Sequence, residues 1–356
     1  MTGDQQPVPF ALTNELTGML NRHRFDDVPG DVDDPADIER WLKFRMAYHA
    51  AQALDGPESF PLQVDVELNS QCNLRCAFCV HGQGKVAYRA LDWPAFARIV
   101  GEGEEHGLVS MKFNYINEPL MVHDLPRYIR YAKEHGVLNT YFATNGVLLH
   151  DRMREELIDA RTSKVMISID ASTAETYERM RRSKHYQRVV DNIYALIDLR
   201  ARRGVEWPLV RVNFLKTELN IHEVEPFIRM WHGVADAIGF QDQIGLPGVA
   251  SDILRDAAYV DHTEFRCSFP FKQLVVDSAG HILPCCTFSG REMPLGHIDD
   301  MSLAEAWTSR QMLTLKATHR VGAWRTNPVC YQCIYGDEPT EAPATNAMLI
   351  QLEPRP

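Results

Sequence analysis

Hydrophobic and polar residues alternate directly before the first group of cysteines. Leu62, Val64, Val66 and Leu68 are separated by single polar residues, and a period of two is typical of a strand. The loop that follows, residues 69–80, contains three of the eight cysteines. These three cysteines are therefore predicted to lie just past the C-terminal end of a strand.

Downstream of this loop, helical and strand-like periodicities alternate. The predicted helices span 92–106, 125–135, 151–160, 174–181, 187–203 and 223–231, and the predicted strands span 108–114, 139–143, 165–169, 209–214 and 236–240. Strands separated by helices are typical of parallel βαβ units. About six such units are too few for a complete eight-stranded barrel. We therefore expect an α/β fold with a partial (β/α)6 TIM-like barrel, whose active site lies at the C-terminal ends of the strands.

The N-terminal part predicts an irregular arm followed by one helix. Residues 1–33 are rich in Pro, Gly, Asp and Asn, which favours irregular structure. Apolar residues then recur at the spacing of one helix face. These residues are Ile38, Trp41, Leu42, Met46, Ala50 and Leu54.

The C-terminal part predicts a small second unit. Residues 242–266 look like a linker, and residues 271–276 and 281–283 flank a turn, which indicates a β-hairpin. A capping box at Ser302 to Glu305 should start a helix that ends near His319. The expected parts are an N-terminal arm and helix (1–60), the barrel (61–243), a hairpin-plus-helix domain (244–336) and a tail (337–356).

The composition narrows the functional classes. Lys and Arg total 37 against 48 Asp and Glu, which gives a net charge of −11, and no basic run offers a path for phosphates. We therefore expect no nucleic acid partner. No segment reaches the roughly 18 apolar residues of a membrane span, and the N-terminus lacks a secretion signal, so a cytoplasmic location without membrane attachment is expected. In that reducing compartment the cysteines should hold metal or perform chemistry instead of forming disulfides.

The first cysteine set is Cys72, Cys76 and Cys79 on one short loop. Three thiolates can bind three irons of a four-iron cluster and leave the fourth iron without a protein ligand. A structural zinc site is the alternative, but zinc of that kind takes four ligands. His81 is the nearest residue that could supply the fourth.

The segment from Cys72 to Cys79, with Phe78 before the last cysteine, resembles the radical S-adenosylmethionine (SAM) superfamily. The resemblance implies a [4Fe–4S] cluster whose open iron binds the amino and carboxylate groups of SAM. It also implies that one electron from the cluster cleaves SAM into methionine and a 5′-deoxyadenosyl radical. Phe78 is then expected beside the cofactor.

Later segments continue this resemblance over roughly residues 62–336. Asn117-Glu118-Pro119 takes the place of a Gly-Gly-Glu-Pro segment without its glycines, which implies that Glu118 holds the SAM amino group. Asn145, together with Ser168 and Asp170, occupies segments that lie beside the SAM ribose and methionine groups in the family. Arg181 matches an arginine that pairs with the SAM carboxylate, for which a guanidinium is suited. The alternatives are a helix-start acid for Glu118, an ordinary turn at Asn145 and a solvated helix face for Arg181.

The second cysteine set is Cys267, Cys285, Cys330 and Cys333. Its spacing resembles the SPASM domain, or the shortened twitch form, and implies an auxiliary [4Fe–4S] cluster with a ligand on every iron. Four thiolates could equally hold zinc. Cys286 is left over; it is either a hydrogen-atom donor to a substrate radical, which would give epimerisation, or a packed thiol or alternate ligand.

These features predict a radical SAM oxidoreductase. Resembling enzymes with one auxiliary cluster include dehydrogenases and epimerases of antibiotic biosynthesis, so we expect hydrogen abstraction from a small polar molecule of sugar, aminocyclitol or nucleoside type. The expected protein partner is an electron donor such as flavodoxin or ferredoxin. The alternatives are SPASM-type modification of a ribosomally made peptide and a non-catalytic metal-binding scaffold.

Overall fold

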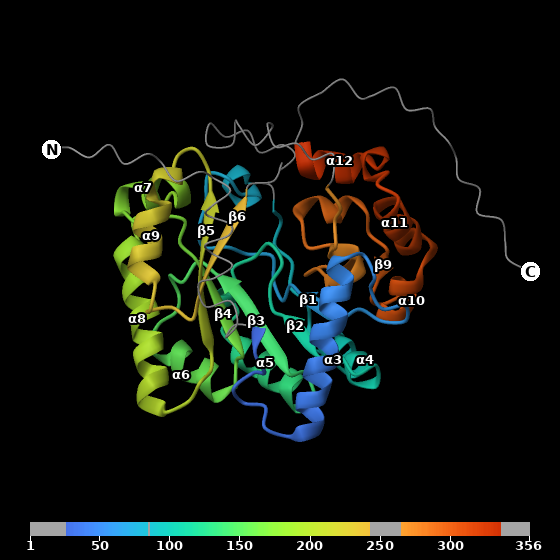
Figure 1. The fold of residues 1–356 in the computed structure, drawn as a ribbon, viewed down its shortest axis with the longest axis horizontal. Helices are drawn as coiled ribbons and strands as arrows, with labels where there is room; N and C mark the ends of the chain where they lie inside the picture. The colour runs from blue at the N-terminus through green and yellow to red at the C-terminus, as the bar shows by residue number, and fades with distance from the viewer. Residues whose placement is uncertain (1–25, 85, 243–264, 336–356) are drawn as a thin grey trace, which may run out of the picture.

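The computed structural model describes residues 26–84, 86–242 and 265–335, and the predicted linker, arm and tail lie largely outside these residues. The described strands form one nine-stranded sheet in the order β6-β5-β4-β3-β2-β1-β7-β8-β9 (Figure 1). The strands are β1 (Gln63–Val66), β2 (Ser110–Lys112), β3 (Asn139–Thr144), β4 (Lys164–Ser168), β5 (Leu209–Lys216), β6 (Ala237–Asp242), β7 (Gln273–Val276), β8 (His281–Leu283) and β9 (Gly296–His297). The parallel pairing of β1 to β6 confirms the predicted partial barrel.

The helices between residues 93 and 231 connect the parallel strands, whereas, among the described residues, one helix precedes β1 and three follow β9. The helices are α3 (Pro35–Gln52), α4 (Trp93–Glu105), α5 (Leu125–Glu134), α6 (Asp151–Asp159), α7 (Ala174–Arg181), α8 (Tyr186–Arg203), α9 (Val224–Trp231), α10 (Leu303–Thr308), α11 (Arg310–Arg320) and α12 (Pro328–Tyr335). Each element predicted between residues 92 and 242 is present within two residues of its expected ends. None of the described helices is both long and apolar enough to cross a bilayer.

The two faces of the sheet differ in polarity because side chains alternate along each strand. Val64 and Val66 of β1 join the core under the helices. Gln63 and Asp65, which alternate with these valines, are also buried, with exposed fractions of 4% and 0%. They face the inside of the partial barrel, which is therefore polar where a complete TIM barrel is filled by branched apolar residues.

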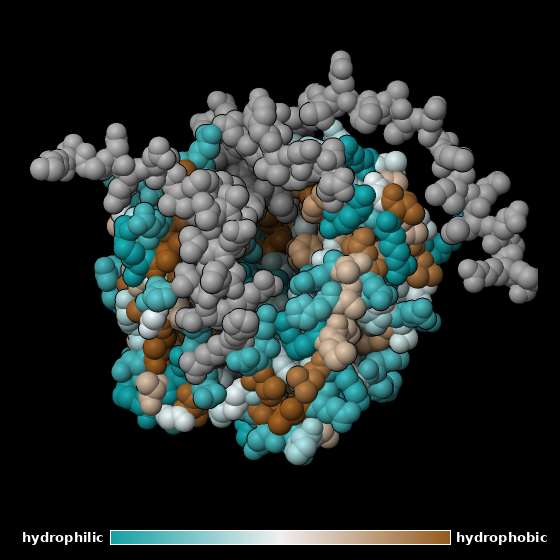
Figure 2. Space-filling view, viewed as in Figure 1, coloured by the Kyte–Doolittle hydropathy of each residue, from teal (hydrophilic) through white to brown (hydrophobic). Residues whose placement is uncertain are grey.

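The N-terminal helix α3 packs on the sheet through a face that shares Trp41 with the predicted one but is otherwise shifted. Trp41 and Phe44 contact Val109 and Leu138, whereas Leu42 is 54% exposed and Met46 74% exposed. Trp41 is buried as predicted, but Leu42 and Met46 are not, because aromatic residues at 41, 44 and 48 bury more apolar area than the aliphatic ones. A strip of apolar atoms along α3 is visible on the surface in Figure 2.

The predicted hairpin is present, but it is also continuous with the barrel sheet. β7 pairs with β8 in the antiparallel sense and with β1 in the parallel sense. Gly280 has φ +92° in the turn of this hairpin, a conformation that costs other residues energy. The sheet thus crosses the expected boundary between residues 243 and 244.

The predicted single helix after Ser302 is in fact two helices. The capping box between Ser302 and Glu305 is present. The helix is interrupted at Ser309, which follows the last residue of α10 and caps the start of α11. The Ser309 side chain accepts a hydrogen bond from the Met312 amide. Serine competes for backbone hydrogen bonds in this way, which explains the break. Cys330 and Cys333 lie on α12, one turn apart.

Candidate functional site

The first cysteine loop, residues 69–80, begins three residues after Val66, at the carboxyl end of β1. Cys76 is 6% exposed, and Cys72 and Cys79 are partly buried. Burial raises the pKa of Cys72 to about 12, and the nearby Cys76 and Cys79 add to this effect. Three thiols this close and this buried lose their protons readily only when a cation compensates the charge, as a metal centre does.

The loop closes tightly on itself. Gly82, in the 3-10 turn η1 (Val80–Gln83), has an ideal Cβ position only 2.1 Å from the Cys76 carbonyl oxygen. A side chain at this position would push the loop apart. The amide of Gly82 also donates to the Cys79 carbonyl at 2.8 Å, so the glycine fixes the spacing of the last two cysteines.

Glu118 is buried between the loop after β2 and the end of β3. Its Oε1 accepts hydrogen bonds from the Thr144 hydroxyl at 2.6 Å and the Leu120 amide at 3.1 Å, and its Oε2 accepts from the Asn145 amide at 2.7 Å. The Glu118 amide donates to the carbonyl of Gln71, next to Cys72. Burial raises the pKa of Glu118, and these hydrogen bonds oppose the rise. The carboxylate thus lies beside the first cysteine loop with accepting capacity left on Oε2.

Arg181 points into the same site instead of into solvent. It forms an ion pair with Asp170, its Nη1 lies 3.8 Å from the Cys76 sulfur, and its guanidinium lies 5.2 Å from the centre of the Phe78 ring. The side chain is 10% exposed, so the alternative of a solvated helix face is not what the structure has. Burial lowers the pKa of Arg181, but the negative charges of Asp170 and Cys76 raise it by more, so the pKa lies above its usual value.

Asn145 and Ser168 complete the set at the carboxyl ends of the strands. Asn145 donates to the Asn73 side chain at 2.7 Å, inside the cysteine loop, and its Oδ1 accepts from the Val147 amide. Ser168 ends β4 and pairs in register with Asn213 of β5. All the residues predicted to contact SAM thus lie around the carboxyl ends of the parallel strands.

Three buried polar atoms at this edge have no hydrogen-bond partner among the described residues. They are Asn117 Nδ2, Asn213 Oδ1 and Arg181 Nε. Unpaired buried polar groups are costly, so this edge suits a polar ligand. Asn213 was not predicted from sequence; an asparagine in an otherwise apolar stretch of β5 was the available signal.

The second cysteine set gathers near α11 and α12. Cys285 is buried. Burial of Cys267 raises its pKa, and the nearby Cys285 and Cys333 raise it further. His319 lies between two members of the set, since its Nδ1 accepts from the Cys267 amide at 3.3 Å and its Nε2 lies 3.6 Å from the Cys330 sulfur. The sequence analysis missed this histidine, whose pKa is lowered to about 4 by burial.

No three Cys, His, Asp or Glu side chains in the described ranges converge on a point where one metal ion would fit. An iron–sulfur cluster does not require such convergence, because each thiolate binds a different iron. The donor chemistry of both cysteine sets is therefore compatible with clusters.

Cys286 has different surroundings from its neighbour Cys285. It packs against Tyr115, Val275 and Leu283. Burial raises its pKa to about 12, and Lys112 on the inside of the barrel opposes the rise. Cys286 thus lies beside the polar barrel interior and also close to the C-terminal cysteines Cys267 and Cys285.

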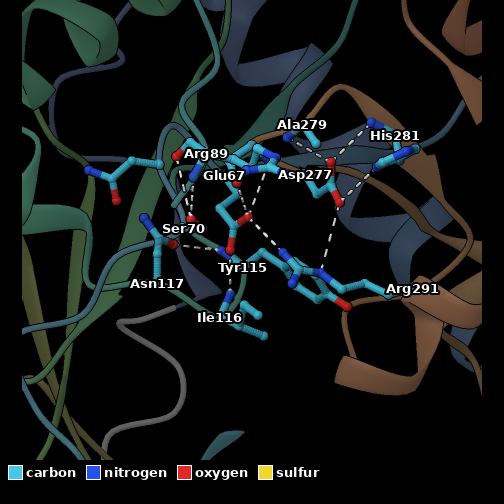
Figure 3. A network of polar contacts seen from close by, with 12 residues as sticks. Glu67, Ser70, Arg89, Tyr115, Ile116, Asn117, Asp277, Ala279, His281 and Arg291 are labelled. Carbon is cyan, nitrogen blue, oxygen red and sulfur yellow. Dashed lines mark hydrogen bonds and ion pairs between the residues drawn. The ribbon is translucent and has the colours of Figure 1, made fainter. Parts of the chain in front are cut away.

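A polar network joins the barrel to the C-terminal hairpin (Figure 3). Glu67 is fully buried; its Oε2 accepts from the Ser278 hydroxyl at 2.7 Å and from Arg291 at 3.0 Å, and its Oε1 accepts from the Ile116 amide at 3.3 Å. The Arg291 guanidinium lies 5.3 Å from the Tyr115 ring centre. Tyr115 donates to the Thr287 carbonyl, just after Cys286. The network therefore links the two cysteine-bearing regions.

Two family models match the chain. One describes the radical SAM superfamily and matches residues 66–227, and the other describes an iron–sulfur cluster-binding domain, SPASM, and matches residues 267–334. The chain therefore contains a radical SAM domain. It carries a SPASM domain in its C-terminal part. These domains bear out the predicted cofactors, namely SAM, its [4Fe–4S] cluster and an auxiliary cluster.

Curated relatives match at low identity. A probable GTP 3′,8-cyclase of Methanocaldococcus jannaschii is 27% identical over 45% of this chain, which spans only 51% of that protein. A tungsten-containing aldehyde ferredoxin oxidoreductase cofactor-modifying protein of Pyrococcus furiosus is 22% identical over 76% of this chain and 94% of its own length. The chain thus spans about half the length of the cyclases that it matches.

Solved structures share the fold. BtrN in complex with AdoMet and 2-DOIA has a TM-score of 0.52 at 16% identity, covering 79% of this chain and 98% of BtrN. SuiB of Streptococcus suis bound to S-adenosylmethionine has a TM-score of 0.54 at 15% identity, covering 92% and 82%. Native anSMEcpe with bound AdoMet has a TM-score of 0.56 at 15% identity, covering 73% and 84%.

Proposed function

We propose that this protein is a radical SAM oxidoreductase that removes a carbon-bound hydrogen from a small polar substrate of sugar, aminocyclitol or nucleoside type. Dehydrogenation or epimerisation would follow. The observation that carries the proposal is the position of Cys286, which packs against Tyr115 and lies close both to Lys112 inside the barrel and to the C-terminal cysteines Cys267 and Cys285. A substrate held there would lie between the two cysteine sets.

In this proposal Cys72, Cys76 and Cys79 hold the SAM-binding cluster. SAM bound at that cluster would, after accepting one electron and releasing methionine, supply a deoxyadenosyl radical able to abstract hydrogen. Glu118, held by three donors, presents an acceptor to the SAM amino group through Oε2. Arg181 neutralises charge beside Cys76 and offers its unpaired Nε. Such fixed partners orient a cofactor before chemistry.

The other residues shape and partition the site. Phe78 lies under the Arg181 guanidinium, and Asn145 ties the cysteine loop to the end of β3. Ser168 ends β4, Asp170 follows two residues later, and both border the proposed SAM pocket. Burial of these groups excludes water from the reacting centre, which protects a radical from side reactions.

Cys267, Cys285, Cys330 and Cys333 are proposed to hold the auxiliary cluster. With four thiolates on four irons it would have no open site and would exchange electrons with the substrate instead of binding it. That role suits dehydrogenation, in which a second electron must leave the substrate. Cys286 offers the other outcome, since transfer of its sulfur-bound hydrogen atom to a carbon radical would complete epimerisation.

The proposal is tested by screening for substrate-dependent 5′-deoxyadenosine. Protein reconstituted without oxygen is incubated with SAM, a reductant and panels of sugars, aminocyclitols, nucleosides and ribosomally made peptides, and deuterated hits reveal the transferred atom. We expect a small polar molecule to raise deoxyadenosine formation. A response to peptides alone would favour the alternative of peptide modification.

Two variants separate the remaining alternatives. Cys76→Ala should abolish SAM cleavage while the protein stays folded, and a wild-type protein that never cleaves SAM would indicate a non-catalytic scaffold. Cys286→Ala should convert an epimerase into a dehydrogenase. Epimerisation at the wild-type rate in this variant would eliminate the donor role.

A further inference from the structure

His319 continues the buried face of α11 toward the second cysteine set. The buried residues of this helix are Met312, Leu315, Lys316 and His319, and separations of three or four residues place them on one helix face. His319 is 1% exposed. A buried side chain normally has a hydrogen-bond partner for each of its polar atoms. For one ring nitrogen of His319 that partner is a cysteine sulfur.

The hydrogen bond at Nδ1 of His319 fixes the tautomer of the ring. A backbone amide can only donate, so the Cys267 amide, 3.3 Å from Nδ1, requires a lone pair on that nitrogen. A doubly protonated ring is excluded for the same reason. The single proton of the neutral ring must then be on Nε2, which lies 3.6 Å from the Cys330 sulfur. The ring therefore presents an N–H donor to this sulfur.

The same tautomer argues against His319 as a metal ligand. Histidine binds metals through an unprotonated ring nitrogen, but Nε2 carries the proton in this arrangement. The proton could move to Nδ1 only if the Cys267 amide lost its acceptor, and a part-buried amide without a partner is costly. His319 therefore supplements the four thiols of the second cysteine set instead of replacing one of them.

We propose that His319 donates a hydrogen bond from Nε2 to the Cys330 sulfur and thereby raises the reduction potential of the auxiliary cluster. The inference rests on the proposed function, which assigns Cys330 to that cluster. Reduction adds one negative charge to a cluster, and a donor proton directed at a ligand sulfur stabilises the more negative state. Because the ring is buried, little water screens this interaction. His319 is thus a positioning residue that acts through Cys330.

A raised potential suits the dehydrogenation that we propose for this protein. The radical left at an alcohol carbon loses one electron to the auxiliary cluster and its hydroxyl proton to water, and a carbonyl forms. The cluster is reduced by that one electron. A cluster with a higher potential accepts the electron more readily, so the hydrogen bond from His319 favours oxidation of the substrate radical.

The test compares variants that keep either the acceptor or the donor of the ring. In His319→Asn the side-chain oxygen can still accept from the Cys267 amide, but the shorter side chain offers no donor to Cys330. In His319→Gln the longer side chain can still donate to Cys330. Lys316→Met is the control for packing, because Lys316 is buried on the same helix face, with its Nζ 3.3 Å from the centre of the Trp307 ring.

The measurement is a potentiometric titration of the reconstituted proteins without oxygen. Cluster reduction is followed by electron paramagnetic resonance. The signal that changes when SAM is added belongs to the cluster at the first cysteine loop, so the two midpoint potentials can be assigned separately. The first cluster then serves as an internal control in every variant.

We expect His319→Asn to make one-electron reduction of the auxiliary cluster about tenfold less favourable, which lowers its midpoint potential by about 59 mV. His319→Gln and Lys316→Met should stay within about a twofold change, roughly 18 mV. The potential of the first cluster should be the same in all four proteins, because other cysteines hold it.

An unchanged auxiliary potential in His319→Asn would overturn the inference alone, and so would a shift of the same size in His319→Gln or Lys316→Met. A second measurement uses the wild type labelled with [15N]histidine, so it does not depend on cluster loading in a variant. We expect a weak hyperfine coupling between the auxiliary cluster and one histidine nitrogen. The strong coupling of a direct iron ligand, or no coupling, would overturn the hydrogen bond. Zinc at the second cysteine set of the wild type would overturn the proposed function as well.

Discussion

Replacing Arg291 by methionine should destabilise the protein through the buried Glu67 carboxylate. Glu67 is 0% exposed and keeps three donors after the change, namely the Ile116 amide and the amide and hydroxyl of Ser278. The lost partner is the only charged group that pairs with Glu67 among the described residues. Removing one member of a buried ion pair costs about 3–5 kcal/mol. Because the Arg291 side chain is 26% exposed, we expect about 2–3 kcal/mol here.

The loss should depend on pH in a defined direction. Burial raises the pKa of Glu67, and Arg291 opposes that rise, so the pKa should rise further in Arg291→Met. A carboxyl group whose pKa is raised in the folded state stabilises it below its unfolded pKa, and this contribution is lost as the pH rises through the folded pKa. The variant should therefore approach wild-type stability toward pH 5 and fall furthest behind at pH 8.

The measurement is urea unfolding without oxygen at pH 5 and pH 8, followed by circular dichroism. Arg98→Met is the matched control, because Arg98 pairs with Asp299 at 2.7 Å on the surface, with both side chains more than half exposed. An exposed pair contributes about 0–1 kcal/mol. Equal losses in the two variants, or a loss at Arg291 that does not change with pH, would refute the reasoning. Adding Glu67→Gln to Arg291→Met should recover part of the stability, since the uncompensated charge is then gone.

Further predictions concern the first cysteine loop and its SAM contacts. Glu118→Gln should weaken SAM binding about tenfold, the equivalent of roughly 1.4 kcal/mol, as measured by equilibrium dialysis; unchanged affinity would remove Glu118 from the site. Arg181→Lys keeps the charge but loses the planar fork, so a similar loss is expected, with Arg179→Lys as a control that should bind normally. Gly82→Ala should lower the iron content because its Cβ would meet the Cys76 carbonyl. An alanine Cβ at position 84 would meet no atom within 4 Å, so Gly84→Ala should keep its iron and cost only about 1–2 kcal/mol of left-handed backbone strain. Equal iron contents in the two glycine variants would contradict the predicted role of Gly82.

Much of the fold follows from local pattern, because the helices and strands of the barrel have strong periodicity and clear ends. The same logic placed Cys72, Cys76 and Cys79 at the carboxyl end of a strand. Features that depend on contacts between distant residues were not predictable in this way. The position of His319 beside Cys330 requires α11 and α12 to pack together, and the inward face of α3 depends on which surface it covers.

The Glu67 network shows the same limit. A charged residue directly after a strand gives no hint of its partner, and Arg291 is 224 residues away in sequence. Arg181 illustrates the opposite case, since family resemblance suggested a site role that helix periodicity alone would have assigned to solvent. The structure places it 3.8 Å from the Cys76 sulfur.

The parallel pairing of β7 with β1 limits how this protein can be dissected. A truncated chain ending before residue 267 would leave β1 as an exposed edge strand with unpaired amides and carbonyls. Such strands pair with other chains and aggregate. The C-terminal domain therefore cannot be removed, or exchanged between homologues, by cutting the chain at the linker. Chimeras would need to carry β1 and β7 from the same parent.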